Sequence, residues 1–151
     1  MLLSACGFHL REDVALPESM QTTALQGVAE FSELDLAFKR NFNRAGYALV
    51  ETSGAQSILK VNKNKFSRRV LSVNSAGDPN EYELTYQLSA VLVDAANKEI
   101  MPPQSIRLYR SYRYDSDVRL AKDAEESHIK KTMMNDAVRQ ILHRMSVTLR
   151  K

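Results

Sequence analysis

The segment Glu81–Asp94 constrains the fold most, because apolar and polar residues alternate along most of it. One face carries Tyr82, Leu84, Tyr86, Leu88, Ala90 and Leu92, and the opposite face carries Glu83, Thr85, Gln87 and Ser89. This period of two is typical of a strand with one buried face. The segment therefore predicts a sheet that is covered by other elements on one side only.

Three more segments are predicted as strands: Met20–Val28, Ile58–Val73 and Ile106–Tyr114. The first alternates poorly, the second is long and basic in its middle, and the third alternates well. Residues 74–80 and 95–98 are rich in turn-forming types and separate neighbouring strands. Pro102 and Pro103 are expected to end whatever element precedes them.

Two amphipathic helices are predicted. The first spans about residues 33–45, with Ser32 as its N-cap and Gly46 after its end. The second begins near Ala121–Glu125 and runs to about Leu149. Its apolar residues recur every third or fourth position, as Ile129, Met133, Ala137, Ile141 and Met145.

The 151 residues suffice for one domain with its own core, and 44% of them are hydrophobic. The element order is β-α-β-β-β-α. We expect an α/β fold, a two-layer sandwich of two helices on a four-stranded, mostly antiparallel sheet. This single domain is expected over residues 20–151, after a tether over residues 6–19.

Cys6 is the only cysteine, so an intramolecular disulfide is excluded. It could be a buried apolar residue, a catalytic thiol or a metal ligand, but no second cysteine or suitably spaced histidine supports the last. The preceding residues favour a fourth interpretation. Leu3, Ser4 and Ala5 before Cys6 form the pattern of a bacterial lipobox, in which the cysteine is acylated.

Residues 1–5 are then the remnant of a lipoprotein signal peptide, which normally carries a basic region and about 7–15 apolar residues. No run of the chain reaches the roughly 18 apolar residues that a membrane-spanning helix needs. Several acyl chains on Cys6 would anchor the protein to a membrane. Gly7, rather than an aspartate, follows the cysteine, which favours the outer membrane.

Catalytic motifs are not apparent, and we predict a protein that is not an enzyme and uses no cofactor. No phosphate-binding glycine loop, GxSxG or HExxH motif occurs. His128 and His143 lie several turns apart on one predicted helix, too far to share a metal. The acids at the start of that helix fit the helix dipole better than a catalytic pair.

Two groups of basic residues stand out in a chain of net charge +3. One is Lys60, Lys63, Lys65, Arg68 and Arg69; the other is Arg107, Arg110, Arg113, Arg119 and Lys122. They could form solvated strand faces or protect sheet edges. They could also bind a phosphorylated ligand. Tyr109, Tyr112 and Tyr114 among the arginines would suit nucleic acid, although a lipobox argues against that.

Four segments together resemble the family of the lipopolysaccharide-assembly lipoprotein LptE, also called RlpB. They are CGFHLR at residues 6–11, NEYEL at 80–84, YRSYRYD at 109–115 and LAKDAEES at 120–127. The likeness spans Cys6 to about Leu149, and the ordered set carries it rather than one motif. The resemblance implies two helices on a four-stranded sheet.

The resemblance also implies an outer-membrane lipoprotein, lipid-anchored through Cys6, that plugs the large β-barrel LptD. The domain would lie within the barrel lumen and on its periplasmic side. The two proteins would together deliver lipopolysaccharide to the cell surface. A structural plug that aids barrel folding without binding lipopolysaccharide, or a nucleic-acid-binding module, are the alternatives.

The resemblance places one lipopolysaccharide-binding position on Lys122. A second basic position of the family, in a hairpin, falls on Ser75 here. Arg68 and Arg69 could compensate from the adjoining strand, and Arg110 is a further candidate. This departure weakens the expectation of ligand binding more than that of the plug.

Overall fold

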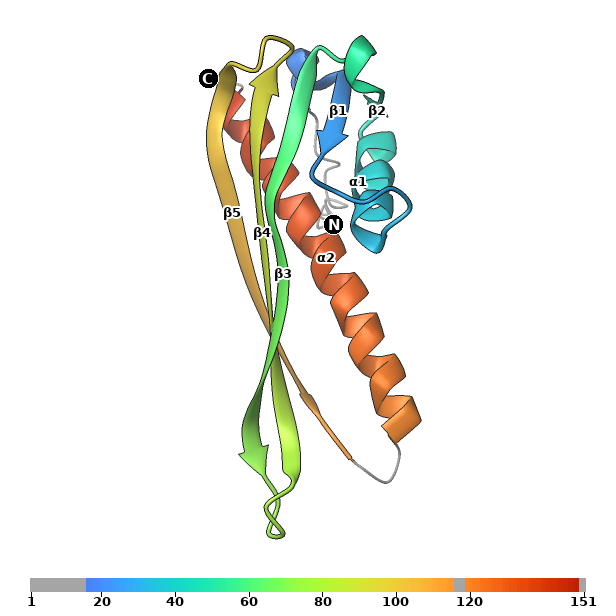
Figure 1. Ribbon diagram of the computed structural model, residues 1–151, viewed down its shortest axis with the longest axis vertical. Helices are drawn as coiled ribbons and strands as arrows, with labels where there is room; N and C mark the ends of the chain where they lie inside the picture. Colours follow the sequence, from blue (N-terminus) through green and yellow to red (C-terminus); the bar gives the residue numbers. More distant parts are fainter. Residues whose placement is uncertain (1–15, 116–118, 150–151) are drawn as a thin grey trace, which may run out of the picture.

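The computed structural model describes residues 16–115 and 119–149 as a five-stranded sheet with two helices on one side of it (Figure 1). The sheet order is β2-β1-β3-β4-β5. Two short 3-10 helices occur at Glu18–Met20 and Thr52–Gly54. The other elements are β1 (Thr22–Gln26), α1 (Glu33–Arg44), β2 (Ala48–Leu49), β3 (Ser57–Val73), β4 (Pro79–Asp94), β5 (Glu99–Arg113) and α2 (Arg119–Leu149).

The expected α/β sandwich is confirmed, but the sheet has five strands rather than four and is mixed rather than mostly antiparallel. β3, β4 and β5 are long and antiparallel, whereas β1 pairs in parallel with both β2 and β3. β2 has only two residues, so no alternation could reveal it. Its parallel pairing follows from the connection, because α1 carries the chain from β1 to β2 as a crossover.

β5 begins at Glu99, before the prolines that we expected to end the preceding element. That expectation is wrong because β5 is an edge strand and is irregular there. Ala90 opposes Gln104 whereas Leu92 opposes Met101, so Pro102 and Pro103 fall where the register shifts. Edges and bulges tolerate proline, since no ladder hydrogen bond is lost there.

The predicted ends of α1 are confirmed. The Ser32 hydroxyl accepts a hydrogen bond from the Asp35 amide at 3.2 Å. At the other end Gly46 adopts a φ of 78°, and the amide of Tyr47 donates to the Phe42 carbonyl at 3.0 Å. The Gly46 amide donates to the Asn43 carbonyl at 3.1 Å, which completes a Schellman motif.

The core lies between the two helices and the inner face of the sheet. α2 runs obliquely along the sheet, behind it in Figure 1, and buries the predicted stripe of Met133, Ala137, Ile141 and Met145. The alternation of β4 is confirmed, because Leu84, Tyr86, Leu88, Ala90 and Leu92 are all buried. α2 begins at Arg119, slightly before the predicted start. Among the described residues, no helix is both long and apolar enough to span a membrane.

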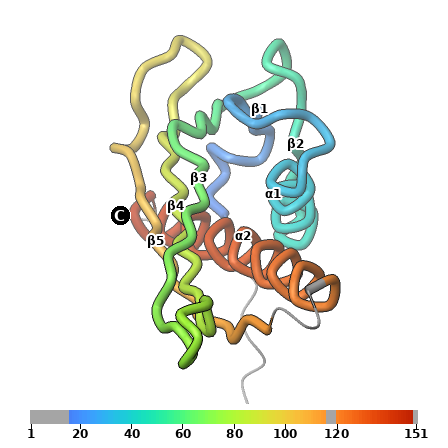
Figure 2. Tube along the Cα trace, turned by 60° about the horizontal axis from the view of Figure 1, so that its bottom comes forward, coloured from blue at the N-terminus to red at the C-terminus, as the bar shows by residue number. Residues whose placement is uncertain are grey.

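The hairpin of β3 and β4 extends beyond α1 and forms the lower end of the molecule in Figure 1. Figure 2 shows that α1 and α2 lie beside each other on one side of the strands. The proposed anchor Cys6 and residues 1–5 lie outside the described residues. The described end of the predicted tether packs against the domain, since Leu16 is buried and its carbonyl accepts a hydrogen bond from the Tyr47 hydroxyl.

Candidate functional site

Aromatic side chains line the inner face of the sheet toward the hairpin end. The rings of Phe66 and Tyr86 stack at a centroid distance of 4.2 Å. The ring centroid of Tyr82 lies 5.8 Å from that of Tyr112 and 5.3 Å from that of Tyr114. Tyr112 is buried and Tyr114 is partly buried against the core. Of the three tyrosines that would suit base stacking only Tyr109 is exposed, which removes support from the nucleic-acid alternative.

A carboxylate from α2 organises the cations around these rings. Glu126 accepts a hydrogen bond from Arg68 Nη1 at 2.8 Å and from Lys130 Nζ at 2.6 Å, and the Tyr112 hydroxyl donates to it as well. The Arg68 guanidinium also lies 4.4 Å from the ring centroid of Tyr82. Four groups from β3, β4, β5 and α2 therefore meet beside Glu126.

Glu126 and Arg68 each favour the charged form of the other. Burial alone would raise the pKa of Glu126, but hydrogen bonds from Lys130, Tyr112 and Arg68 outweigh it and lower the pKa to about 2. The hydrogen bond to Glu126 raises the pKa of Arg68 above its usual range. Burial raises the pKa of Tyr112 to about 12. Arg68 is thus a charged residue whose charge is already compensated within the fold.

Arg69 and Arg110 are each held by a carboxylate in a different place. Arg69 points to the opposite, outer face of the sheet, where its Nε donates to Glu83 Oε1 at 2.8 Å across the strand pair. Arg110 lies 3.7 Å from Asp136 of α2 and donates to the Tyr109 carbonyl at 3.1 Å. The predicted basic residues therefore do not form one cluster.

Lys122 lies in the first turns of α2 and lines a cavity of about 510 Å³. The cavity lies between the β3–β4 hairpin, the end of β5 and the start of α2, with Asn74, Pro79, Asn80, Arg113, Tyr114, Asp115 and Lys122 around it. The Lys122 ammonium makes an ion pair with Glu125 at 2.8 Å. Tyr114 joins this cavity to the aromatic rings beside Arg68.

Arg113 lines the same cavity, although the sequence singled it out only as a member of the second basic group and not as a site residue. It ends β5 opposite Glu81, close to the turn of the β3–β4 hairpin. Among the described residues no carboxylate makes an ion pair with it. Its place beside Lys122 follows from the register of β4 and β5, and the alternation of residues along one strand does not determine that register. Ser75, the position of the missing family cation, lies in the adjacent turn after Asn74.

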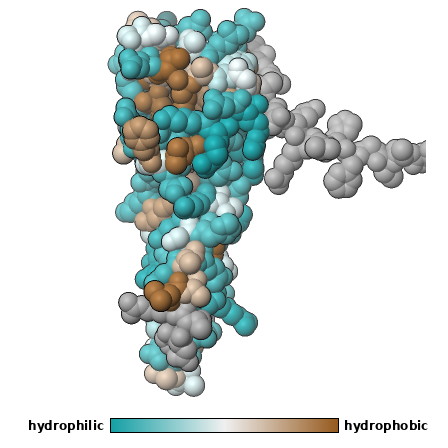
Figure 3. Space-filling model, turned by 90° about the vertical axis from the view of Figure 1, so that its right-hand side faces the viewer, coloured by the Kyte–Doolittle hydropathy of each residue, from teal (hydrophilic) through white to brown (hydrophobic). Residues whose placement is uncertain are grey.

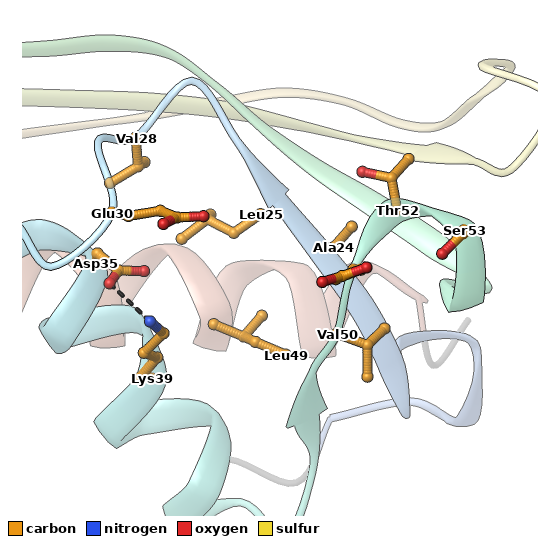
Figure 4. A pocket seen from close by; sticks show the side chains of 11 residues that line it. Ala24, Leu25, Val28, Glu30, Asp35, Lys39, Leu49, Val50, Thr52 and Ser53 are labelled. Atoms are coloured by element: carbon orange, nitrogen blue, oxygen red, sulfur yellow. Dashed lines mark hydrogen bonds and ion pairs between the residues drawn. The ribbon is translucent and has the colours of Figure 1, made fainter.

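A second hollow of about 580 Å³ lies beside α1, along the paired strands β1 and β2 (Figure 4). Its apolar lining includes Leu25, Val28 and Leu49. Apolar side chains also gather in the upper part of the face that Figure 3 shows. Its charged residues are Glu30, Asp35, Glu51 and Lys39, and Lys39 pairs with Asp35 at 2.8 Å. This acidic hollow does not suit a phosphorylated ligand, so the cavity at Lys122 is the better candidate.

Comparison with known proteins agrees with this fold. The family model described as "LptE: Lipopolysaccharide-assembly" matches residues 20–145. The LPS-assembly lipoprotein LptE of Pectobacterium atrosepticum is 25% identical over 96% of this chain and 79% of that protein.

Two solved structures are also similar. Lipoprotein B of Nitrosomonas europaea has a TM-score of 0.73 and 29% identity, over 94% of this chain and 92% of that one. Rare lipoprotein B of Shewanella oneidensis has a TM-score of 0.71 and 25% identity, over 84% and 95% of the two chains. Since the family model covers most of the chain, the protein belongs to the lipopolysaccharide-assembly family LptE.

Proposed function

We propose that this chain is an outer-membrane lipoprotein, anchored through acylated Cys6, that plugs the LptD barrel and binds lipopolysaccharide during its assembly. The observation that carries the assembly role is the family match over residues 20–145. The barrel partner and the position in its lumen rest on the resemblance of the chain to this family. The proposal is for a binding and scaffolding role and not for a catalysed reaction.

The cavity between the hairpin and α2 supports direct lipopolysaccharide binding. Lys122 and Arg113 both line it, and they are the kind of cations that make charge-assisted bonds to phosphates. The nearby end of β3 exposes apolar side chains, namely Val70, Leu71 and Val73, which acyl chains could cover. A phosphorylated glycolipid combines these two chemistries. Arg68, Arg69 and Arg110 would contribute further positive charge.

One observation favours the alternative of a structural plug without a lipopolysaccharide site. Arg68, Arg69, Arg110 and Lys122 each already have a carboxylate partner within the chain. A phosphate would have to compete with these partners, which reduces the gain from each contact. Arg113 lacks such a partner among the described residues, so it distinguishes the two proposals.

Titration of the purified domain with lipopolysaccharide tests the direct role. We expect saturable binding that weakens as the ionic strength rises, because the cations involved are partly exposed. The Arg113→Gln variant should bind less tightly. Binding that neither salt nor Arg113→Gln alters would leave the structural plug as the better account.

A further inference from the structure

The two edges of the long three-stranded part of the sheet differ in how they are protected. β5 forms one edge, and Pro102 and Pro103 within it have no N–H to offer. Arg144 of α2 donates to the Ser105 carbonyl at 2.9 Å, and Arg110 donates to the Tyr109 carbonyl at 3.1 Å. Side-chain hydrogen bonds thus occupy two backbone carbonyls of β5.

β3 forms the other edge below the point where β1 ends. β1 pairs with β3 only over Ser57–Lys60. At Gly27, with a φ of 78°, the chain turns away so close to β3 that a Cβ atom would lie 2.4 Å from the Val61 carbonyl oxygen. Among the described residues no strand pairs with this side of β3 from Lys63 to Val73. We name Lys63–Val73 the open edge.

The open edge is long and free of the devices that protect β5. At about 3.3 Å per residue it runs for roughly 35 Å. It contains no proline, and within the described part of the chain no side chain hydrogen-bonds to its backbone. In a strand paired on one side only, every second residue directs its N–H and C=O outward, and this applies to Lys63–Val70, before the register shifts near Ser72 and Val73. The open edge can therefore accept another strand.

The charges of the open edge indicate which strand would fit. Lys63 and Lys65 lie on the outer face opposite Ser89 and Gln87, and no described carboxylate pairs with either of them. The inner face alternates with them and carries Asn64, Phe66, Arg68 and Val70, of which Arg68 is already paired with Glu126. An added strand would place its side chains beside the two lysines on one face and, on the other, beside Phe66 and Val70 with the compensated Arg68 between them.

We propose that the open edge of β3 binds an extended segment of a partner protein in which acidic and apolar residues alternate. The acidic side chains of that segment lie beside Lys63, Lys65 and Arg69, and its apolar side chains lie beside Phe66 and Val70. Backbone hydrogen bonds supply the affinity, and the alternation supplies the specificity. A second copy of this chain does not fit, because its own open edge would set lysine against lysine. None of these residues lines the cavity at Lys122, but Arg69 and Val70 are shared with the lipid contacts proposed above.

The probe is a short blocked peptide of alternating glutamate and valine, titrated into the ¹⁵N-labelled chain. We expect amide shifts confined to residues 63–73, and slower hydrogen exchange at every second amide of the open edge. Lys65→Glu should weaken binding about tenfold, since it replaces an attraction by a repulsion. Arg107→Glu is the matched control, because Lys65, Gln87 and Arg107 form one row across the sheet and Arg107 lies at the opposite edge.

The same peptide with every residue N-methylated keeps its charges but loses the donors along both of its edges. It should not bind the unaltered chain. Three results would each overturn the proposal: no shifts at millimolar peptide, equal losses in the Lys65 and Arg107 variants, or undiminished binding of the N-methylated peptide. In the second and third cases the lysines would attract acidic peptides without strand pairing. In the first they would only protect the edge from aggregation.

Discussion

Arg68 of β3 and Glu126 of α2 are 58 residues apart in the chain, yet Arg68 Nη1 lies 2.8 Å from Glu126 Oε2. Lys130 and the Tyr112 hydroxyl donate to the same carboxylate. Glu126 thus ties the first half of the long helix to the sheet at the end where the cavity lies. Lys122 lies one turn earlier on that helix.

Replacing Glu126 by glutamine should destabilise the fold. The carboxylate is mostly buried and its removal leaves Arg68 and Lys130 without their partner. We expect a loss of about 2 kcal/mol in the free energy of unfolding at pH 7. Urea denaturation measures it, and Glu125→Gln is the control, because Glu125 is exposed and should change stability by less than about 0.5 kcal/mol.

The same network predicts a specific acid sensitivity. Folding lowers the pKa of Glu126 from 4.5 to about 2, so the ionised carboxylate is favoured in the folded state. Its contribution is therefore complete above pH 4.5 and is lost as the pH falls toward 2. The difference in stability between the unaltered chain and Glu126→Gln should shrink over that window. A difference that stays constant down to pH 2 would contradict the assignment.

Gly27→Ala should be more harmful than Gly46→Ala, although both glycines have a φ of 78°. An added Cβ at Gly27 meets the Val61 carbonyl oxygen at 2.4 Å, whereas nothing lies within 4 Å at Gly46. We expect losses of about 3 kcal/mol at Gly27 and about 1 kcal/mol at Gly46. Urea denaturation of both variants measures the difference. Equal losses would mean that β1 and β3 separate easily.

Lys122→Glu should weaken lipopolysaccharide binding while the domain stays folded. The substitution places a negative charge in the cavity that Arg113 and Lys122 line, and we expect at least a fivefold loss, about 1 kcal/mol or more. Titration at low and at high salt measures it, with circular dichroism as the test of folding. Lys98→Glu, in the turn before β5, is a control of equal charge change. If both variants lose affinity equally, binding follows net charge rather than this cavity.

Much of the fold could be predicted because the responsible signals are local. The alternation of β4 and the Ser32 and Gly46 ends of α1 each depend on a few neighbouring residues. The parallel pairing of β1 could not be predicted, since it depends on where α1 returns the chain. β2 is too short to carry any pattern. The prediction from the prolines of β5 was wrong because this strand tolerates proline through its position at the edge, and that position is a property of the whole sheet.

The sequence predicts individual residues of the site but not how they are grouped in space. The sequence identifies Arg68, Arg69, Arg110 and Lys122 as basic, but not that strand alternation sends Arg68 and Arg69 to opposite faces beside different carboxylates. Arg113 was missed as a site residue because its place beside Lys122 depends on the register of β4 and β5 and on the start of α2. Distances across the sheet decide which cations act together, and no local pattern encodes them.

The most direct test of the proposed function is to identify which proteins co-purify with the chain from the outer membrane, where the proposal places it. The chain, expressed behind a complete lipoprotein signal peptide and tagged at its C-terminus, is solubilised in mild detergent and purified, and co-purifying proteins are identified by mass spectrometry. We predict acylated Cys6 and a stoichiometric large β-barrel, LptD. An acylated protein in the outer membrane that brings down no barrel would contradict the plug.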